Sequence, residues 1–221
     1  MSNVEAPPAP ASTGRWIPAG LVLAVVATIV PTAVHGNPPI ESAELTLRWI
    51  AERPSWRPVH LLAVAAIVLW AACLNALARG AGPRPAGDVG RVAALTMTVA
   101  TAVFAVYFGL HAWLAVPAAE LVAGAVPAAL VVERTAAAMI VLGAVAFTAQ
   151  ALLGAAIALH GLTLALDRRF PRWLGPVGLA AGLGWLTGAV IVDFAVIVPF
   201  TAAAWLWSLV LAGVCWSRRR S

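Results

Sequence analysis

Residues 172 to 216 read RWLGPVGLAAGLGWLTGAVIVDFAVIVPFTAAAWLWSLVLAGVCW, and after Arg172 the one charged side chain in this run is Asp193. A bilayer core about 30 Å thick is crossed by roughly 20 helical residues. The run is therefore long enough for two crossings. It predicts one transmembrane helix over Arg172–Val192 and a second over Phe194–Trp216, with the turn between them at Asp193.

Four further stretches have the length and apolar character of a membrane span. They are Trp16–His35, Val59–Arg79, Arg91–Leu114 and Thr135–Leu166. Segments rich in Gly and Pro separate several of them, as turns require. The sequence predicts an all-α polytopic membrane protein, with a bundle of six transmembrane helices over residues 15–217. Residues 1–14 are expected to be a disordered tail, and residues 218–221 a short basic tail.

Composition points to lipid as the main solvent of the chain. Apolar residues make up 62% of the sequence and charged residues 10%, whereas soluble domains carry about a quarter charged residues. The net charge is +5, but the basic residues are all arginines in short clusters between apolar runs. Such clusters are typical of orientation signals at a membrane. Nucleic acid is therefore not an expected partner, and the lipid bilayer is.

Arginine placement predicts the orientation, because positive residues in short loops resist export. With both termini in the cytoplasm, ten of the 14 basic residues fall inside and four, all on the expected outer segments, fall outside. The outer four are Arg48, Arg53, Arg57 and Arg134. The Ala-, Gly- and Arg-rich composition is typical of a bacterial protein, so we expect a multi-pass protein of the inner membrane.

Two of the expected outer segments have a recognisable pattern. In Glu41–Arg53 the residues Leu45, Trp49 and Glu52 fall on one helical stripe, which indicates a short helix on the membrane surface. The segment 116–132 is apolar but contains two prolines. It is expected to be a loop packed against the outer mouth of the bundle.

Glycines in the fifth expected span have the spacing of a helix-packing motif. Gly178 and Gly182 are four residues apart, as are Gly184 and Gly188. Small residues at this spacing allow the backbones of two membrane helices to approach closely. Glycine scattered by a GC-rich genome is the alternative explanation.

Three histidines are expected at the outer side: His35, His60 and His111. Neutral imidazole is a good ligand for haem, copper or zinc, so these three are the candidates for a metal or haem site. No two of them have a helical i, i+4 spacing, and solvated or hydrogen-bonded interfacial histidines are the alternative. The sequence specifies no particular cofactor.

Other candidates are two acids and a set of aromatic residues. Asp193 and Glu120 are the candidate catalytic acids, although Asp193 also fits a simple turn residue. Tryptophans near the middle of spans could line a pocket for an apolar or cationic ligand or could fill space between helices. The candidate pocket residues are Trp70, Trp185, Trp205, Trp207 and Tyr107.

The stretch Phe170–Gly175, followed by the glycine-rich Leu179–Leu186, resembles the fifth helix of a group of small bacterial membrane proteins with six helices. That group is catalogued as a domain of unknown function. The resemblance implies a six-helix fold and supplies no catalytic residue. We therefore expect an integral membrane protein without an assigned reaction. The alternatives are an enzyme or carrier for an isoprenoid-like or other small apolar ligand, and a haem or metal protein. Protein partners cannot be named from the sequence.

Overall fold

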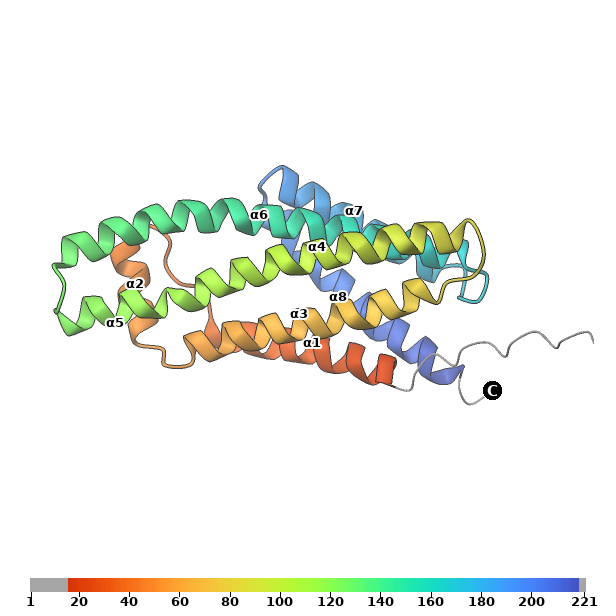
Figure 1. Ribbon diagram of the computed structural model, residues 1–221, viewed down its shortest axis with the longest axis horizontal. Helices are drawn as coiled ribbons and strands as arrows, with labels where there is room; N and C mark the ends of the chain where they lie inside the picture. Colours follow the sequence, from red (N-terminus) through yellow and green to blue (C-terminus); the bar gives the residue numbers. More distant parts are fainter. Residues whose placement is uncertain (1–15, 219–221) are drawn as a thin grey trace, which may run out of the picture.

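The computed structural model describes residues 16–218, without the side chains of residues 31, 32, 34 and 35. Within these residues the chain forms eight α-helices and no strand (Figure 1), which confirms the all-α fold class. The tails expected at 1–14 and 218–221 lie outside the described residues, apart from Arg218. The helices are α1 (Trp16–His35), α2 (Ala43–Ala51), α3 (Trp56–Arg79), α4 (Ala86–Trp113), α5 (Ala115–Ala123), α6 (Ala128–Leu166), α7 (Leu174–Val190) and α8 (Phe194–Ser217).

Several of these helices have the dimensions of membrane spans. Among the described residues α3, α6, α8 and the unit that α4 and α5 form together are long and apolar enough to cross a bilayer. The helices α1 and α7 are apolar but shorter over the parts considered, Trp16–Val30 and Leu174–Val190. Large apolar side chains also face outwards, with Leu95 67%, Ile140 76% and Leu206 63% exposed. An outer surface of this kind is stable against lipid and costly against water, so the fold is compatible with a helical membrane protein.

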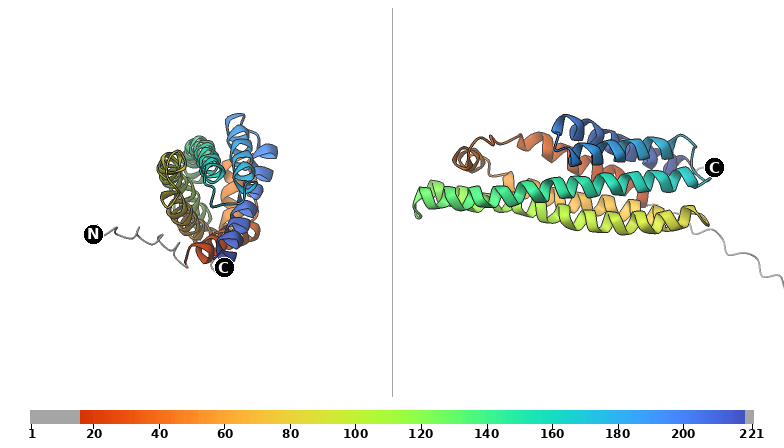
Figure 2. Two further views of the ribbon diagram at one scale, coloured as in Figure 1. Left: turned by 90° about the vertical axis from the view of Figure 1, so that its right-hand side faces the viewer. Right: turned by 90° about the horizontal axis from the view of Figure 1, so that it is seen from above.

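Six of the described helices form a closed ring. In chain order α1 packs on α3, α3 on α4, α4 on α6, α6 on α7, and α7 on α8, which returns to α1. Figure 2 shows this arrangement along the long axis of the molecule and from above. Because consecutive helices joined by short turns run antiparallel and pack as neighbours, the chain order largely determines the ring. Its interior is apolar, with fully buried Leu74, Met97, Leu153 and Leu211.

The two ends of the bundle differ. The start of α1, the end of α8, the turn between α3 and α4 and the turn between α6 and α7 lie together at one end, which we call the terminal end (Figure 1). The opposite end carries α2 and α5 beside the start of α6 (Figure 1). Helix α6 has 39 residues and spans roughly 58 Å at about 1.5 Å per residue. It is thus longer than the roughly 30 Å needed to cross a bilayer core.

The end opposite the terminal end carries a small cap, made of α2, α5 and the first turns of α6 (Figure 1). A second apolar core, separate from that of the ring, holds it together. That core consists of Leu47, Ile50, Trp56, Leu114, Ala118, Leu121 and Val131. The cap is therefore a packed unit with its own interior and not a set of loose loops.

Helix α2 occupies the segment expected to form a surface helix, but it turns a different face inwards. Its buried residues include Thr46, Leu47 and Ile50, whereas Leu45 is 50% exposed. The side chain of Ser42 caps the helix by accepting a hydrogen bond from the Leu45 N–H. The stripe of Leu45, Trp49 and Glu52 therefore does not describe the packed face, because α2 packs on α5 and not only on a lipid surface.

The segment 116–132 is helical over most of its length, so the expectation of a loop is wrong. It contains α5, which ends at Gly124 in a left-handed conformation (φ 66°), and the beginning of α6. Pro117 lies in the first turn of α5, where proline needs no hydrogen-bond donor, and Pro127 directly precedes α6. These are positions at which helices tolerate proline. The two prolines mark helix starts and not an irregular segment.

Glycines bring α6 and α7 into backbone contact. A Cβ atom added to Gly182 would lie 2.1 Å from the backbone nitrogen of Ala158, and one added to Gly154 would lie 2.5 Å from that of Leu186. On the other side of α7, a Cβ on Gly178 would meet the Trp207 ring at 2.5 Å and one on Gly184 would meet the Phe200 ring at 2.3 Å. A Cβ atom added to Gly188 would lie 2.8 Å from the backbone nitrogen of Ile197, on α8. The four glycines of the predicted packing motif, Gly178, Gly182, Gly184 and Gly188, thus lie against α6 and α8.

The carboxylate of Asp167 links the two turns at the terminal end. Asp167 follows α6, is 4% exposed, and its Oδ2 accepts hydrogen bonds from Arg169 Nη2 (2.6 Å) and the Gly82 N–H (3.4 Å). Arg169 also donates to the backbone oxygen of Gly80. Burial raises the pKa of Asp167, but its hydrogen bonds and charge contact with Arg169 outweigh this and lower it overall. The carboxylate therefore ties the α6–α7 turn to the α3–α4 turn.

Candidate functional site

Two histidines meet where the cap joins the ring. His60 on α3 and His111 on α4 are linked by a hydrogen bond of 3.2 Å between His111 Nδ1 and His60 Nε2. His60 Nδ1 lies 2.7 Å from the backbone oxygen of Trp56 and has to be the donor there, because a carbonyl only accepts. His60 Nε2 is then the acceptor in the neutral ring, and His111 Nδ1 carries the proton between the two rings.

Aromatic rings surround this histidine pair. Trp56 lies 4.2 Å from His60 between ring centroids, Phe108 lies 5.4 Å from His60, and Tyr107 lies 4.8 Å from His111. The indole N–H of Trp56 donates to the backbone oxygen of His111 (2.7 Å). His60 is fully buried. The pair is therefore a rigid, hydrogen-bonded junction between α3 and α4, which sequence spacing did not indicate because the residues are 51 positions apart.

The structure brings together two of the three histidines proposed as metal or haem ligands. The side chain of His35 lies outside the described residues. Among the described residues no group of three His, Cys, Asp or Glu side chains is placed to hold a metal ion. His60 Nε2 is the ring nitrogen that could bind a metal, and it already accepts a hydrogen bond from His111. The observed pair is thus arranged for hydrogen bonding between helices.

Three of the tryptophans near the middle of the spans donate hydrogen bonds from their indole N–H groups, each to a different acceptor. Trp70 donates to Ser208 Oγ (3.0 Å), Trp185 to Gln150 Oε1 (2.7 Å) and Trp207 to the backbone oxygen of Leu174 (2.9 Å). Trp205 is partly buried against the main core. The three hydrogen-bonded rings therefore join α3 to α8, α7 to α6 and α8 to α7, and Tyr107 contacts His111 instead.

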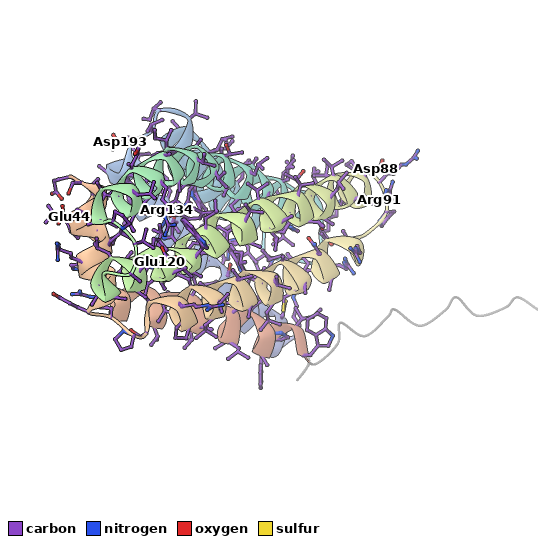
Figure 3. All side chains as sticks on the ribbon, turned by 60° about the vertical axis from the view of Figure 1, so that its left-hand side comes forward. Glu44, Asp88, Arg91, Glu120, Arg134 and Asp193 are labelled. Atoms are coloured by element: carbon purple, nitrogen blue, oxygen red, sulfur yellow. The ribbon has the colours of Figure 1, made fainter. Side chains whose placement is uncertain are left out.

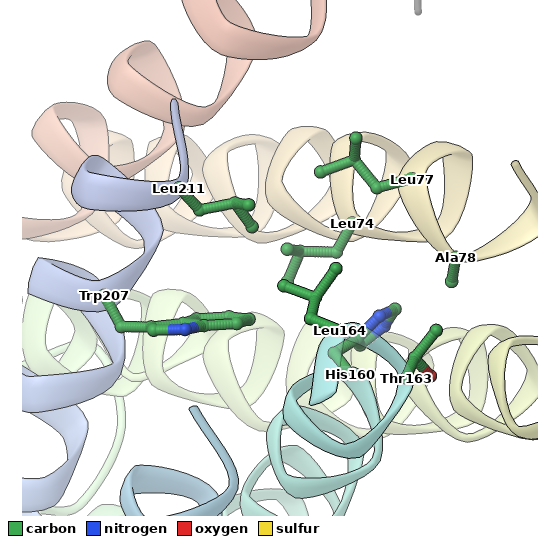
Figure 4. Close-up of a pocket in the computed structure, with 8 residues that line it drawn as sticks. All are labelled: Leu74, Leu77, Ala78, His160, Thr163, Leu164, Trp207 and Leu211. Carbon is green, nitrogen blue, oxygen red and sulfur yellow. The ribbon is translucent and has the colours of Figure 1, made fainter. Parts of the chain in front are cut away.

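One small cavity lies inside the ring, beside His160 (Figure 4). It has a volume of about 10 Å³ and is lined by eight residues of α3, α6 and α8, among them His160, Thr163 and Trp207. This volume accommodates about one water molecule. His160 is 3% exposed, and its Nε2 has no hydrogen-bond partner among the described residues. The cavity is too small for an organic ligand.

The two candidate acids have structural partners. Asp193 is the N-cap of α8, and its Oδ1 accepts a hydrogen bond from the Ala195 N–H (2.8 Å). Glu120 on α5 forms an ion pair with Arg134 on α6 (Figure 3). The first contact stabilises the start of a helix, and the second holds the cap together. Neither acid lines the small cavity beside His160 or the larger groove described below.

The larger cavity is a groove of about 360 Å³ on the cap, between α2 and α5. Two arginines, Arg53 and Arg57, line it together with apolar residues of both helices. The apolar lining consists of Ile50, Ala51, Pro54, Ala115, Ala118, Ala119, Val122 and Ala123. Sequence reasoning treated the two arginines as orientation signals and α5 as a loop, so it missed this groove. Residues 115–123 are apolar apart from Glu120, so no periodic pattern distinguished the face that lines the groove.

A comparison of the chain with models of protein families, with curated proteins and with solved structures finds no match. The fold and the geometry of the groove therefore carry the functional argument.

Proposed function

We propose that the chain is an inner-membrane protein with six spans, both termini in the cytoplasm and the cap outside, which binds an apolar or amphiphilic ligand in the groove between α2 and α5. The groove is the observation that carries the proposal. Its volume of about 360 Å³ falls in the range of roughly 300–1,000 Å³ that small-molecule sites occupy. Most of its lining is apolar, with a few polar groups, which is also typical of such sites.

Three observations support six spans in this orientation. Helices α1 and α7 are apolar and complete the ring formed with the four longer units. Both described chain ends lie at the terminal end (Figure 1). Seven of the eleven arginines within residues 16–218 lie in the turns at that end or near the adjoining helix ends, and such residues favour the cytoplasm. They are Arg79, Arg84, Arg91, Arg168, Arg169, Arg172 and Arg218. The implied six-helix fold agrees with the resemblance of the Phe170–Leu186 region.

The orientation is tested with a reporter enzyme fused after Ser221. A reporter active in the cytoplasm is the expected result. A reporter active in the periplasm would reverse the orientation and place the cap inside the cell.

Binding is better supported than catalysis by the described residues. Asp193 caps α8, and Glu120 pairs with Arg134, so both candidate acids already stabilise the fold. An enzyme acting on an apolar substrate would need one of these acids near the groove, whose lining contains no carboxylate. The groove itself offers space, apolar walls and positive charge, and these are properties of a binding site.

The binding function is tested by filling the groove. Ala119 lines it and is exposed, whereas Val116 lies on the same helix outside it. Native mass spectrometry of the detergent-solubilised protein measures binding of dioctanoylglycerol and dioctanoyl phosphatidic acid. Ala119→Trp should weaken binding of the more tightly held lipid at least tenfold, or about 1.4 kcal/mol, and Val116→Trp should leave it unchanged. Equal binding by both variants and the unmodified protein would overturn the proposal.

A further inference from the structure

The charge of the groove is positive and mostly uncompensated. Arg53 and Arg57 are its charged lining residues, and no acid lines it. Arg53 Nη1 lies 3.9 Å from Glu52 Oε2, but that side chain is 77% exposed, and such exposed pairs contribute little. Among the described residues no carboxylate forms an ion pair with Arg57. Two other acids of the cap are paired elsewhere, Glu44 with Arg48 and Glu120 with Arg134.

Arg53 is held in place before any ligand arrives. Its guanidinium lies over the ring of Trp49, 3.4 Å from the centroid, and Nη1 donates to the backbone oxygen of Trp49 (2.8 Å). A side chain fixed in this way loses less conformational entropy when it binds an anion. The planar guanidinium can donate two parallel hydrogen bonds to a phosphate. Arg53 thus has the chemistry and the order of an anion ligand.

The opposite wall of the groove is apolar. Residues Ala115, Ala118, Ala119, Val122 and Ala123 follow the 3–4 spacing that places them on one face of α5. Four of the five are alanines, which leave room beside the helix. An inorganic anion gains nothing from such a wall, whereas a hydrocarbon chain is stabilised by roughly 25 cal/mol for each Å² of apolar surface buried. The groove therefore matches a molecule with both an anionic group and an apolar tail.

The position of the two arginines in the chain suits contact with lipid headgroups. Arg57 is the second residue of α3, a helix long and apolar enough to span the membrane. Trp56 directly precedes Arg57 in the chain, and its ring contacts that of Trp49, with the ring centroids 5.7 Å apart. Of the two, Trp49 is partly exposed, and tryptophans at such positions are enriched at the interface between lipid and water.

We propose that the groove binds an anionic membrane lipid, with its phosphate on Arg53 and Arg57 and an acyl chain along the alanine face of α5. This inference rests on the proposed binding function and adds the class of ligand. It assigns headgroup recognition to the two arginines and tail recognition to α5.

The test uses the full-length protein in a non-ionic detergent and native mass spectrometry. Three probes are titrated: dioctanoyl phosphatidic acid, dioctanoylglycerol with the same tails and no phosphate, and inorganic phosphate. Phosphatidic acid should bind at least tenfold more tightly than either of the others. Arg57→Gln and Arg53→Gln should each reduce this preference about tenfold, because each removes charge-assisted hydrogen bonds.

Arg48→Gln is the matched control, since Arg48 lies on α2 outside the groove and pairs with Glu44. It should leave the preference for phosphatidic acid unchanged. An equal loss with Arg48→Gln would show that general surface charge, and not the groove, selects the lipid. Because Arg53 also contacts Trp49, Arg57→Gln decides the result if Arg53→Gln lowers the melting temperature.

The remaining outcomes separate this inference from the binding function. If phosphatidic acid and dioctanoylglycerol bind equally and Ala119→Trp weakens both, the groove binds lipid but does not select phosphate, and the inference is wrong while the function stands. If inorganic phosphate binds as tightly as phosphatidic acid, the ligand is a soluble anion and the lipid assignment is overturned. If Ala119→Trp changes no binding event, both proposals are wrong.

Discussion

His111 Nδ1 lies 3.2 Å from His60 Nε2, so a hydrogen bond between two imidazoles joins α4 to α3 where the cap meets the ring. Trp56 reinforces the same junction through its backbone oxygen, which accepts from His60, and its indole N–H, which donates to His111. The junction couples the cap to the helices of the ring. Its contribution to stability can be measured directly.

Replacing His60 should destabilise the protein. In His60→Leu the hydrogen bond between His111 Nδ1 and His60 Nε2 is lost, and a hydrogen bond of this kind contributes about 0.5–1.5 kcal/mol. Thermal or denaturant unfolding of the detergent-solubilised protein measures the change. His160→Leu is the control, because His160 Nε2 has no partner among the described residues and an apolar replacement should leave stability unchanged or raise it. Equal losses in the two variants would contradict the role of the junction.

Adding a methyl group to Gly154 should separate α6 from α7. The new Cβ would lie 2.5 Å from the backbone nitrogen of Leu186, which cannot move aside as a side chain can. Overpacking of this kind typically costs about 1–3 kcal/mol. Gly143→Ala, also in α6, meets nothing within 4 Å and should be neutral or stabilising, since alanine favours helix. A comparison of melting temperatures tests the pair, and a neutral Gly154→Ala would show that the helices are not in close contact.

Asp167 should stabilise the terminal end at neutral pH and cease to do so in acid. Its pKa is lower in the folded protein than the ordinary value of 3.8, mainly through hydrogen bonds from Arg169 that outweigh the effect of burial. The stabilisation is therefore complete above the ordinary value and is lost as the pH falls through the lower, folded-state pKa. Asp167→Asn should lower stability by about 1–3 kcal/mol at pH 7. Unfolding measured from pH 7 to pH 2 should show this difference shrinking, and a constant difference would contradict it.

The turn between α7 and α8 contains a strained residue. Val192 has φ of 59°, and the Asp193 N–H bonds to the Gly188 oxygen at 2.9 Å while the Val192 N–H bonds to the Ala189 oxygen. This is the helix-ending pattern in which glycine is preferred at the left-handed position. Val192→Gly should raise stability by about 1 kcal/mol.

Val190→Gly provides the comparison for this turn, because Val190 is the last residue of α7 and gains no relief of strain from glycine. Its melting temperature should stay the same or fall. A higher melting temperature for Val190→Gly than for Val192→Gly would show that the turn is not strained at Val192.

The pattern of apolar and polar residues along the chain was sufficient to predict where the long helices lie. The expected Trp16–His35 and Phe194–Trp216 agree with α1 and α8 to within one residue, because apolar length and flanking polar residues set the ends of such helices. It was not sufficient for residues 116–132, where two prolines at helix starts suggested a loop. Proline is compatible with a first helical turn as well as with a loop, so the sequence alone left both open.

By itself the sequence determined that this chain contains several apolar helices long enough to cross a bilayer, because an apolar segment in lipid can satisfy its backbone hydrogen bonds only by forming a helix. The tertiary structure decided which residues meet: His60 with His111, Glu120 with Arg134, and Arg53 and Arg57 with the alanine face of α5. These contacts depend on how each helix is rotated and where it crosses its neighbour. Rotation follows from close packing between distant segments, and spacing along one chain does not encode it.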